Sequence, residues 1–187
     1  ARLWRTSTRI SFWSKAFSRS PSPNFWINAR MDPLIRPYKP EDREAVVRML
    51  ADSDPWKRLG YTSSDWERLF DALPQGREGF VVVTNGALAG LALLRQRFLM
   101  GDYLELLVIA PSVRGKGLGS ALLKYLEGLV FPRAKNLFAC VSDFNTEARR
   151  FYGKNGYQEI GPIPNFLIPG SAEILMRKTT GPAREEK

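Results

Sequence analysis

The 187-residue chain contains no histidine and only one cysteine, Cys140. A single cysteine excludes an intramolecular disulfide, and without histidine a His/Cys metal site is implausible. We therefore expect no metal and a reducing compartment, the cytoplasm. Apolar runs are also short, and none approaches the roughly 20 residues that cross a bilayer. The sequence accordingly predicts neither an integral membrane protein nor a membrane partner.

Acidic residues are missing from residues 1–30, which carry six of the nine net positive charges. This segment is interpreted in three ways: as translated upstream sequence before a natural start at Met31, as an organelle-targeting leader, or as a basic arm for nucleic acid or membrane. We favour the first, because Pro21 and Pro23 break any long helix and no secretory apolar stretch is present. The rest of the chain is only +3, so no nucleic-acid partner is expected.

The length fits one domain with a substantial core. We expect residues 1–30 to be a basic leader, residues 31–180 to form the domain and residues 181–187 to be a polar tail. Within the domain, the stretch from Tyr103 to Val130 dominates the pattern. It begins as a short apolar run typical of a buried strand, breaks at Pro111, and continues as a glycine loop and an amphipathic helix.

The glycine loop reads Arg114-Gly115-Lys116-Gly117-Leu118-Gly119. Its glycines let the backbone turn sharply and approach a ligand, while free N–H groups of the first helical turn point into the loop. Two cations add to the positive end of the helix dipole, so a phosphate or pyrophosphate suits the site. The spacing matches neither a P-loop nor a dinucleotide fingerprint.

Two motifs resemble the GNAT superfamily of acetyl-CoA-dependent N-acetyltransferases. The R-x-x-G-x-G arrangement that starts at Arg114 is similar to the acetyl-CoA loop of that family. Downstream, the stretch from Asn145 to Tyr157 resembles the signature N-x-x-A-x-x-F-Y-x-x-x-G-Y. The resemblance covers about residues 33–178 and implies acetyl-CoA as co-substrate.

Periodicity and turn signals predict elements in the order β-α-α-β-β-β-α-β-α-β-β. Predicted strands cover residues 34–38, 79–84, 87–98, 103–109, 136–141, 157–160 and 172–177, with turns at Asn85-Gly86 and Gly101-Asp102. The GNAT resemblance implies an α/β (α+β) fold. Its sheet would be mixed, mostly antiparallel and seven-stranded, splayed between the fourth and fifth strands, with helices on both faces.

The resemblance assigns acetyl-CoA binding to a set of backbone and loop positions and to the second motif. These positions are Leu107, Val108, Ile109, Arg114, Gly115, Lys116, Gly117, Leu118, Gly119, Ser120, Asn145 and Tyr152. Strand N–H groups would hold the acetyl carbonyl. Tyr152 would protonate the departing thiolate, since a phenol with a pKa near 10 is protonated at neutral pH. A Tyr152 that is merely packed in the core is the alternative, and Asn145 is explained equally well as a helix cap.

Glu105 is the only charged residue inside the apolar run and is the candidate general base. An unpaired carboxylate in a central strand is costly unless it borders a wet cleft. Strand alternation places it on the face of Leu107 and Ile109, from which it would take the proton through a water. The alternative is a structural ion pair with Arg95 or Arg97.

The chain is faintly similar to the ribosomal-protein alanine N-acetyltransferases, whose fifth-strand glutamate is replaced here by Cys140. A lone cysteine in a strand is more often a small core residue than an acetyl-carrying nucleophile.

The acceptor is an amine of open identity: a small amine, an amino acid or a protein N-terminus. By family position, residues 40–73 and the loop 161–171 would form its walls, with Trp56, Tyr61 and Trp66 as pocket or packing residues. The alternative function is a non-catalytic acetyl-CoA sensor or scaffold. A homodimer is compatible with either function.

Overall fold

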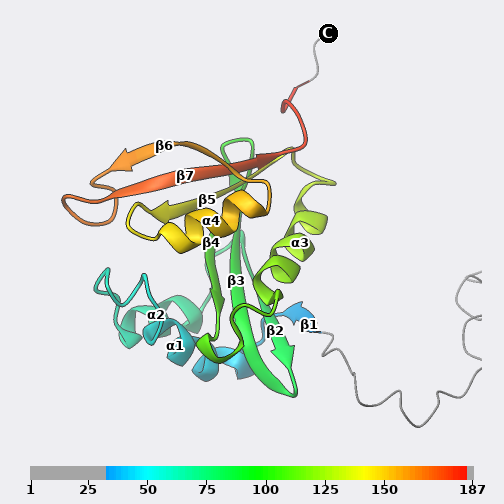
Figure 1. Ribbon diagram of the computed structural model, residues 1–187. Coiled ribbons are helices and arrows are strands. Elements are labelled where there is room, and N and C mark those ends of the chain that lie inside the picture. The colour runs from blue at the N-terminus through cyan, green and yellow to red at the C-terminus, as the bar shows by residue number, and fades with distance from the viewer. Residues whose placement is uncertain (1–32, 185–187) are drawn as a thin grey trace, which may run out of the picture. The chain divides into compact units, whose positions relative to one another are not determined.

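The computed structural model describes residues 33–184 (Figure 1). In chain order the elements are β1 (Leu34–Pro37), η2 (Pro40–Asp42), α1 (Arg43–Ala51), α2 (Ser63–Asp71), β2 (Arg77–Thr84), β3 (Ala87–Phe98), β4 (Gly101–Ile109), η3 (Pro111–Val113), α3 (Leu118–Val130), β5 (Asn136–Ser142), α4 (Thr146–Lys154), β6 (Gln158–Pro164) and β7 (Ala172–Thr179). The predicted order is confirmed. The expected leader, residues 1–30, lies outside the described residues, as do residues 185–187 of the expected tail.

The strands form one seven-stranded sheet in the order β1-β2-β3-β4-β5-β7-β6. Every neighbouring pair is antiparallel except β4 and β5, which are parallel. These two strands pair only from Asp102 to Leu104 against Leu137 to Ala139. Beyond that point they diverge, as Figure 1 shows. The predicted splay between the fourth and fifth strands is therefore present.

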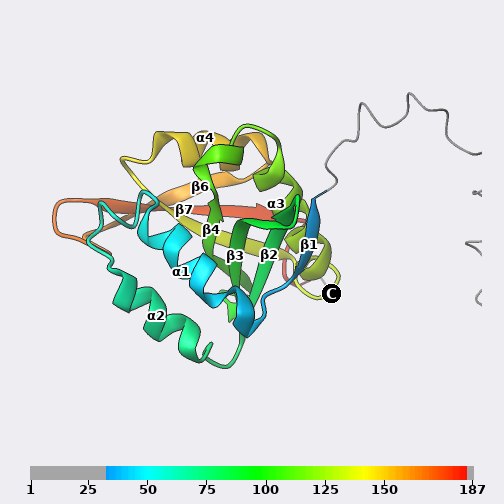
Figure 2. The same cartoon turned by 90° about the horizontal axis from the view of Figure 1, so that it is seen from below.

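A hydrophobic core lies on each face of the sheet. On one face, Leu122 and Leu126 of α3 pack with strand residues and with Tyr152 of α4. On the other face, Val46 of α1 and Trp66 of α2 pack against β2, β3 and β4. Figure 2 shows α1 and α2 on one side of the strands and α4 on the other. The gap between β4 and β5 is thus bordered by different helices on its two faces.

A bulge in β4 changes which residues face the splay. The β3 ladder pairs Leu93 and Leu94 with residues on either side of Glu105, which is the extra residue. Beyond it, Leu107 and Ile109 pack against the core that contains α3 and α4. Glu105 lies on the opposite face, where it pairs with Arg77 of β2 and Arg95 of β3. The expectation that it shares a face with Leu107 and Ile109 is wrong, because the bulge breaks the strand alternation.

The turn from β3 into β4 differs from its prediction. Leu99 and Met100 make it, with φ of +42° and +59°, whereas Gly101 and Asp102 already belong to β4. A Cβ atom on Gly101 would stand 2.2 Å from the carbonyl oxygen of Asn136. This glycine therefore serves the close approach of β5, not a turn.

The sixth strand is longer than predicted, and its extension contains two prolines. β6 continues through Pro162 and Pro164, so the loop to β7 covers only residues 165–171. Proline removes a backbone donor and is tolerated in a strand at the edge of a sheet. β6 is such an edge strand, since it pairs with β7 alone.

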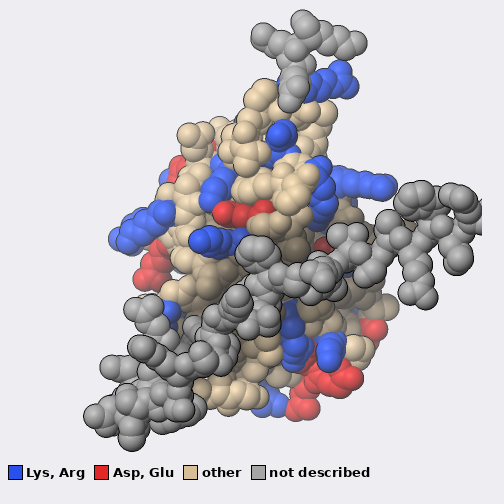
Figure 3. All heavy atoms as spheres, turned by 90° about the vertical axis from the view of Figure 1, so that its right-hand side faces the viewer, with Lys and Arg blue, Asp and Glu red and all other residues tan. Residues whose placement is uncertain are grey.

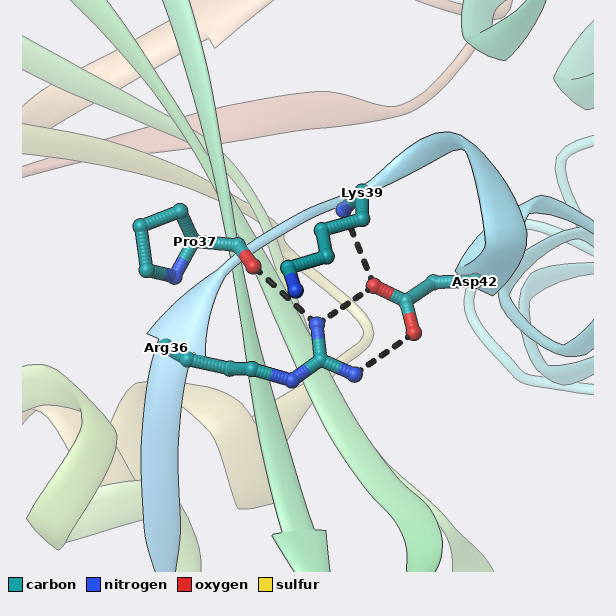
Figure 4. Close-up of polar contacts among 4 residues, drawn as sticks. All are labelled: Arg36, Pro37, Lys39 and Asp42. Atoms are coloured by element: carbon teal, nitrogen blue, oxygen red, sulfur yellow. Dashed lines mark hydrogen bonds and ion pairs between the residues drawn. The ribbon is translucent and has the colours of Figure 1, made fainter.

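An ion pair fixes the corner where β1 leads into the first helices (Figure 4). The guanidinium of Arg36 donates to both carboxylate oxygens of Asp42, at 2.7 and 2.8 Å. Asp42 also accepts from the backbone N–H of Lys39 at 2.9 Å, while Arg36 donates to the carbonyl of Pro37. The bond from Arg36 lowers the pKa of Asp42 below its ordinary value. One carboxylate therefore joins the end of β1 to the start of α1.

Charges of both signs are mixed on the face shown in Figure 3. Where described atoms are visible, lysine and arginine side chains alternate with acidic side chains and with uncharged surface. In residues 33–184, no helix combines the length and apolar character that crossing a membrane requires.

Candidate active site

A cavity of about 710 Å³ lies at the splay between β4 and β5. Its walls come from the end of β4, the glycine loop, the start of α3, the loop between β5 and α4, and the segment between α1 and α2. The predicted site residues that line it are Leu107, Val108, Ile109, Arg114, Gly115, Gly117, Leu118, Gly119, Ser120 and Asn145. Lys116, Tyr152 and Glu105 are not among its lining residues.

The glycine loop has the geometry of an anion site. Gly115 and Gly117 have φ of +75° and +81°, a conformation that side chains other than glycine rarely adopt. A Cβ on either residue would meet no described atom within 4 Å, so open space lies above the loop. Gly117 caps α3, whose first N–H groups have no intrahelical acceptor. These groups and the helix dipole favour a phosphate at this end of the cavity.

Two contacts hold the loop on its supports. The Nε of Arg114 donates to the carbonyl oxygen of Ile109 at 3.0 Å, which ties the loop to the end of β4. A Cβ atom on Gly119 would lie 3.2 Å from the ring of Phe151, so this glycine permits α3 and α4 to pack closely. The loop is therefore held in place by both neighbouring elements.

Asn145 has the predicted cap. Its Oδ1 accepts from the backbone N–H of Ala148 at 3.1 Å, which satisfies one free donor at the start of α4. Because Asn145 also lines the cavity, it can cap the helix and meet a ligand at once.

Tyr152 is a core residue of α4 with 6% of its surface exposed. Its ring packs against those of Phe151 and Tyr157, with centroids 5.3 and 5.2 Å away. Burial raises the pKa of its phenol well above the ordinary value, and nearby Cys140 raises it further. The hydroxyl is thus held in its protonated form.

Glu105 is engaged by two arginines. Its carboxylate accepts from Nε and Nη2 of Arg77 on β2, at 2.5 and 3.1 Å, and lies 3.8 Å from Arg95 on β3. The expected ion pair with Arg95 is present, but the shorter contact is to Arg77, which the sequence did not indicate. Arg97 does not pair with it among the described residues. Arg77, Arg95 and Glu105 lie on three adjacent strands, and only the fold brings them together.

Cys140 is half-buried on β5. Its neighbours Ala139 and Val141 belong to the core with α3 and α4, so strand alternation turns Cys140 to the opposite face. Burial raises the pKa of its thiol, so the reactive thiolate is disfavoured. This environment supports the interpretation of Cys140 as a small packed residue rather than a nucleophile.

Several residues that line the cavity were not named as candidates by sequence reasoning, among them Arg58 and Phe144. The guanidinium of Arg58 lies over the ring of Phe144, 4.0 Å from its centroid, and both residues line the cavity. This contact joins the segment after α1 to the loop after β5. Phe144 could have been noticed as the neighbour of Asn145, but no pattern marks Arg58. Of the aromatic candidates, Trp56 lines the cavity, and Tyr61 stacks on Trp66 at 4.8 Å.

Residues 43–157 match the sequence profile of the acetyltransferase (GNAT) family. The chain is 32% identical over 150 residues to the peptidyl-lysine N-acetyltransferase YjaB of Salmonella typhimurium, a match that covers 72% of this chain and 97% of that protein. It is also 34% identical over 101 residues to an uncharacterized N-acetyltransferase of Methanocaldococcus jannaschii, across 53% of this chain and 64% of that protein.

Solved structures share the fold at lower identity. The ribosomal-protein-S18-alanine N-acetyltransferase from Escherichia coli superposes with a TM-score of 0.66 at 20% identity, covering 83% of this chain and 98% of that one. An aminoglycoside 6'-N-acetyltransferase complexed with coenzyme A gives 0.67 at 22% identity, covering 82% and 99%. The chain belongs to the GNAT acetyltransferase family. It is an N-acetyltransferase whose acetyl donor is acetyl-CoA.

Proposed function

We propose that this enzyme moves the acetyl group of acetyl-CoA to a primary amine by direct attack in a ternary complex. The observation that carries the proposal is the cavity at the β4–β5 splay. It has a glycine loop and a helix N-terminus at one end and the exposed edge of β4 along one wall.

The donor would lie along the diverging half of β4. Beyond Leu104 this strand has no β5 partner, so its edge backbone groups are free to bind the pantetheine arm. An N–H in the segment Leu107 to Ile109 would stabilise the oxyanion that forms on the acetyl carbonyl. The pyrophosphate would rest on residues 114–120, where Arg114 adds a positive charge.

Tyr152 is proposed as the general acid. Attack of the amine on the carbonyl carbon forms the C–N bond, and the C–S bond then breaks with the electron pair on sulfur. The thiolate takes a proton from the Tyr152 hydroxyl, which recovers one from solvent. The raised pKa of this phenol keeps it protonated at neutral pH, so a proton is present when the thiolate forms.

The general base is a separate part of the proposal. Glu105, acting through a water, is the sequence-based proposal, and its position on the α1 and α2 side suits an acceptor that enters there. Its charge is already compensated by Arg77 and Arg95, however. An ion pair of this kind also explains why a glutamate lies in a central strand.

The acceptor classes to test follow from the names of related proteins. YjaB of Salmonella typhimurium is named for peptidyl-lysine, the Escherichia coli enzyme for an alanine of a ribosomal protein, and a chimeric structural neighbour for spermidine. We propose an amine within these classes, without preference among them.

The first test is a thermal shift with acetyl-CoA, CoA, NAD and ATP. A ligand that binds only the native state raises the midpoint with its concentration, so a rise with the two CoA species alone is expected. Turnover is then measured as thiol release with a lysine peptide, an alanine-starting peptide and spermidine. Absence of any CoA-dependent shift would overturn the donor site. A shift without thiol release would favour a non-catalytic acetyl-CoA module.

A further inference from the structure

A second carboxylate lies near the splay and was not singled out by sequence. Glu173 on β7 has only 5% of its surface exposed, and its Oε1 accepts from the hydroxyl of Ser142 at 2.6 Å. Within residues 33–184 no lysine or arginine forms an ion pair with it. A buried carboxylate without a cation is costly and calls for a reason.

The position of Glu173 in the sheet supplies one. Pairing of β4 with β5 stops at Ala139, so Ser142 lies in the diverging half of β5. Glu173 is directly opposite Ser142 in the antiparallel β5–β7 ladder, about 5 Å from it across the strands. Glu173 therefore lies one strand away from the gap that would hold the thioester, behind the residues that line the cavity.

Glu173 faces the acceptor side of that gap. Its neighbour Ile174 packs into the core with α3 and α4, so strand alternation turns Glu173 to the opposite face, where α1 and α2 lie. Burial is the main cause of the raised pKa of Tyr61, of Tyr103 on β4 and of Cys140 on β5, and the charge of Glu173 adds a smaller increase to each. Its carboxylate therefore lies near groups from three other segments.

The two carboxylates at the splay are held differently. Glu105 is paired with two guanidinium groups, whereas Glu173 is held by one neutral hydroxyl. Burial raises the pKa of Glu173, the bond from Ser142 lowers it in part, and the nearby charge of Asp143 raises it again. A carboxylate with a raised pKa takes a proton more readily than an ordinary one.

We propose that Glu173, oriented by Ser142, is the general base that takes the proton from the acceptor ammonium. The inference rests on the proposed acetyl transfer and names its acceptor as a cationic amine that approaches from the α1 and α2 side. The ammonium gives one proton to Glu173 through a water, and the neutral amine attacks the acetyl carbon. After attack, the nitrogen releases its second proton to solvent while Tyr152 protonates the thiolate.

The deciding variant is Glu173→Gln, since the amide oxygen can still accept from Ser142 but cannot take a proton. We expect kcat/KM to fall by about 10²-fold, with acetyl-CoA affinity changed less than twofold. Glu159→Gln is the matched control. Glu159 lies on the neighbouring strand β6, where it pairs with Arg149 and does not contact Glu173 or Ser142. Its replacement should therefore leave kcat/KM unchanged.

The pH profile separates a base from a structural residue. In the wild type, kcat/KM should fall as pH drops through the raised pKa of Glu173, and Glu173→Gln should lack this acidic limb. Ser142→Ala removes the bond that lowers this pKa, so the limb should move to higher pH. Tyr61, Tyr103, Cys140 and Asp143 are titratable groups that interact with Glu173, and all four remain in both variants.

The outcomes separate this inference from the proposed function. Wild-type protein without thiol release from a lysine peptide, an alanine-starting peptide or spermidine would overturn both, because a base then has no reaction to serve. An active wild type with an equally active Glu173→Gln variant, or with an unchanged acidic limb, would overturn the inference alone. If Glu173→Gln does not fold, the shift of the limb in Ser142→Ala decides, and no shift counts against the base.

Discussion

The carboxylate of Glu105 on β4 accepts two hydrogen bonds from the guanidinium of Arg77 on β2, at 2.5 and 3.1 Å. The two residues are separated by β3 and by 28 positions in the chain. Side chains of both are mostly shielded, with 15% and 24% exposed. The glutamate that is conspicuous in the sequence thus has a structural partner.

Replacing Glu105 by Gln should lower the free energy of unfolding by about 1.5–3 kcal/mol, the range of charge-assisted hydrogen bonds. Urea unfolding measures this loss, and kcat/KM is measured on the same sample. Glu78→Gln is the control. Glu78 accepts a hydrogen bond from Gln96 at an exposed site, so this variant should change stability by less than about 0.5 kcal/mol. A stable variant with strongly reduced turnover would instead identify Glu105 as the base.

Tyr152→Phe should lower kcat by about 10²-fold with little change in acetyl-CoA affinity, because only the phenolic proton is lost. Tyr125→Phe on α3 is the control and should be unaffected. Burial raises the pKa of Tyr152, so its deprotonation should cause no alkaline decline in kcat below about pH 10. Normal turnover of Tyr152→Phe would remove this residue from the mechanism.

Gly117→Val should abolish acetyl-CoA binding, since the new side chain would occupy the open space above the loop. It also forces a β-branched residue to a φ of +81°, at a cost of about 1–3 kcal/mol. Gly76→Val provides the control for strain alone. Gly76 has the same φ and equally open surroundings, outside the cavity. The prediction fails if both variants show the same ligand-induced thermal shift.

Asp42→Asn should cost about 1–2 kcal/mol of stability at pH 7, because Asp42 accepts bonds from Arg36 and from the backbone of Lys39. The pKa of Asp42 is lowered in the folded state. Its contribution is therefore present above the ordinary carboxyl pKa near 4 and is lost as pH falls through the lower folded pKa. Urea unfolding between pH 7 and pH 2 should show the difference from wild type shrinking toward acid.

The control for Asp42 is Asp71→Asn, which breaks the exposed pair with Arg43. Exposed pairs contribute little, so we expect a change below about 0.5 kcal/mol. A difference between wild type and Asp42→Asn that stays constant with pH would contradict the linkage.

A chain that begins at Met31 should keep the midpoint of unfolding within about 2 °C and kcat/KM within about twofold, because β1 is then complete. A chain that begins at Lys39 removes β1 and should be markedly less stable, since Leu34 to Pro37 pair with β2. Thermal unfolding and thiol release measure both. Loss of activity in the chain that begins at Met31 would show that residues 1–30 belong to the functional protein.

Local sequence patterns determined much of this protein. Asn85-Gly86 requires a tight hairpin, and both residues have the positive φ of such a turn. Gly115 and Gly117, placed between an apolar strand and an amphipathic helix, determine the left-handed turns of the glycine loop. Asn145 caps the following helix as expected. These features depend on neighbours in the chain, so the sequence was sufficient to predict them.

Tertiary structure decided the features that depend on strand pairing. The bulge at Glu105 follows from the register between β3 and β4, and it turns that side chain away from Ile109. Its pairing with Arg77 requires β2 to lie two strands away. Glu173 and Ser142 are 31 positions apart, and only the antiparallel β5–β7 ladder sets them opposite each other beside the gap. Such pairings reflect long-range packing, which local periodicity does not encode.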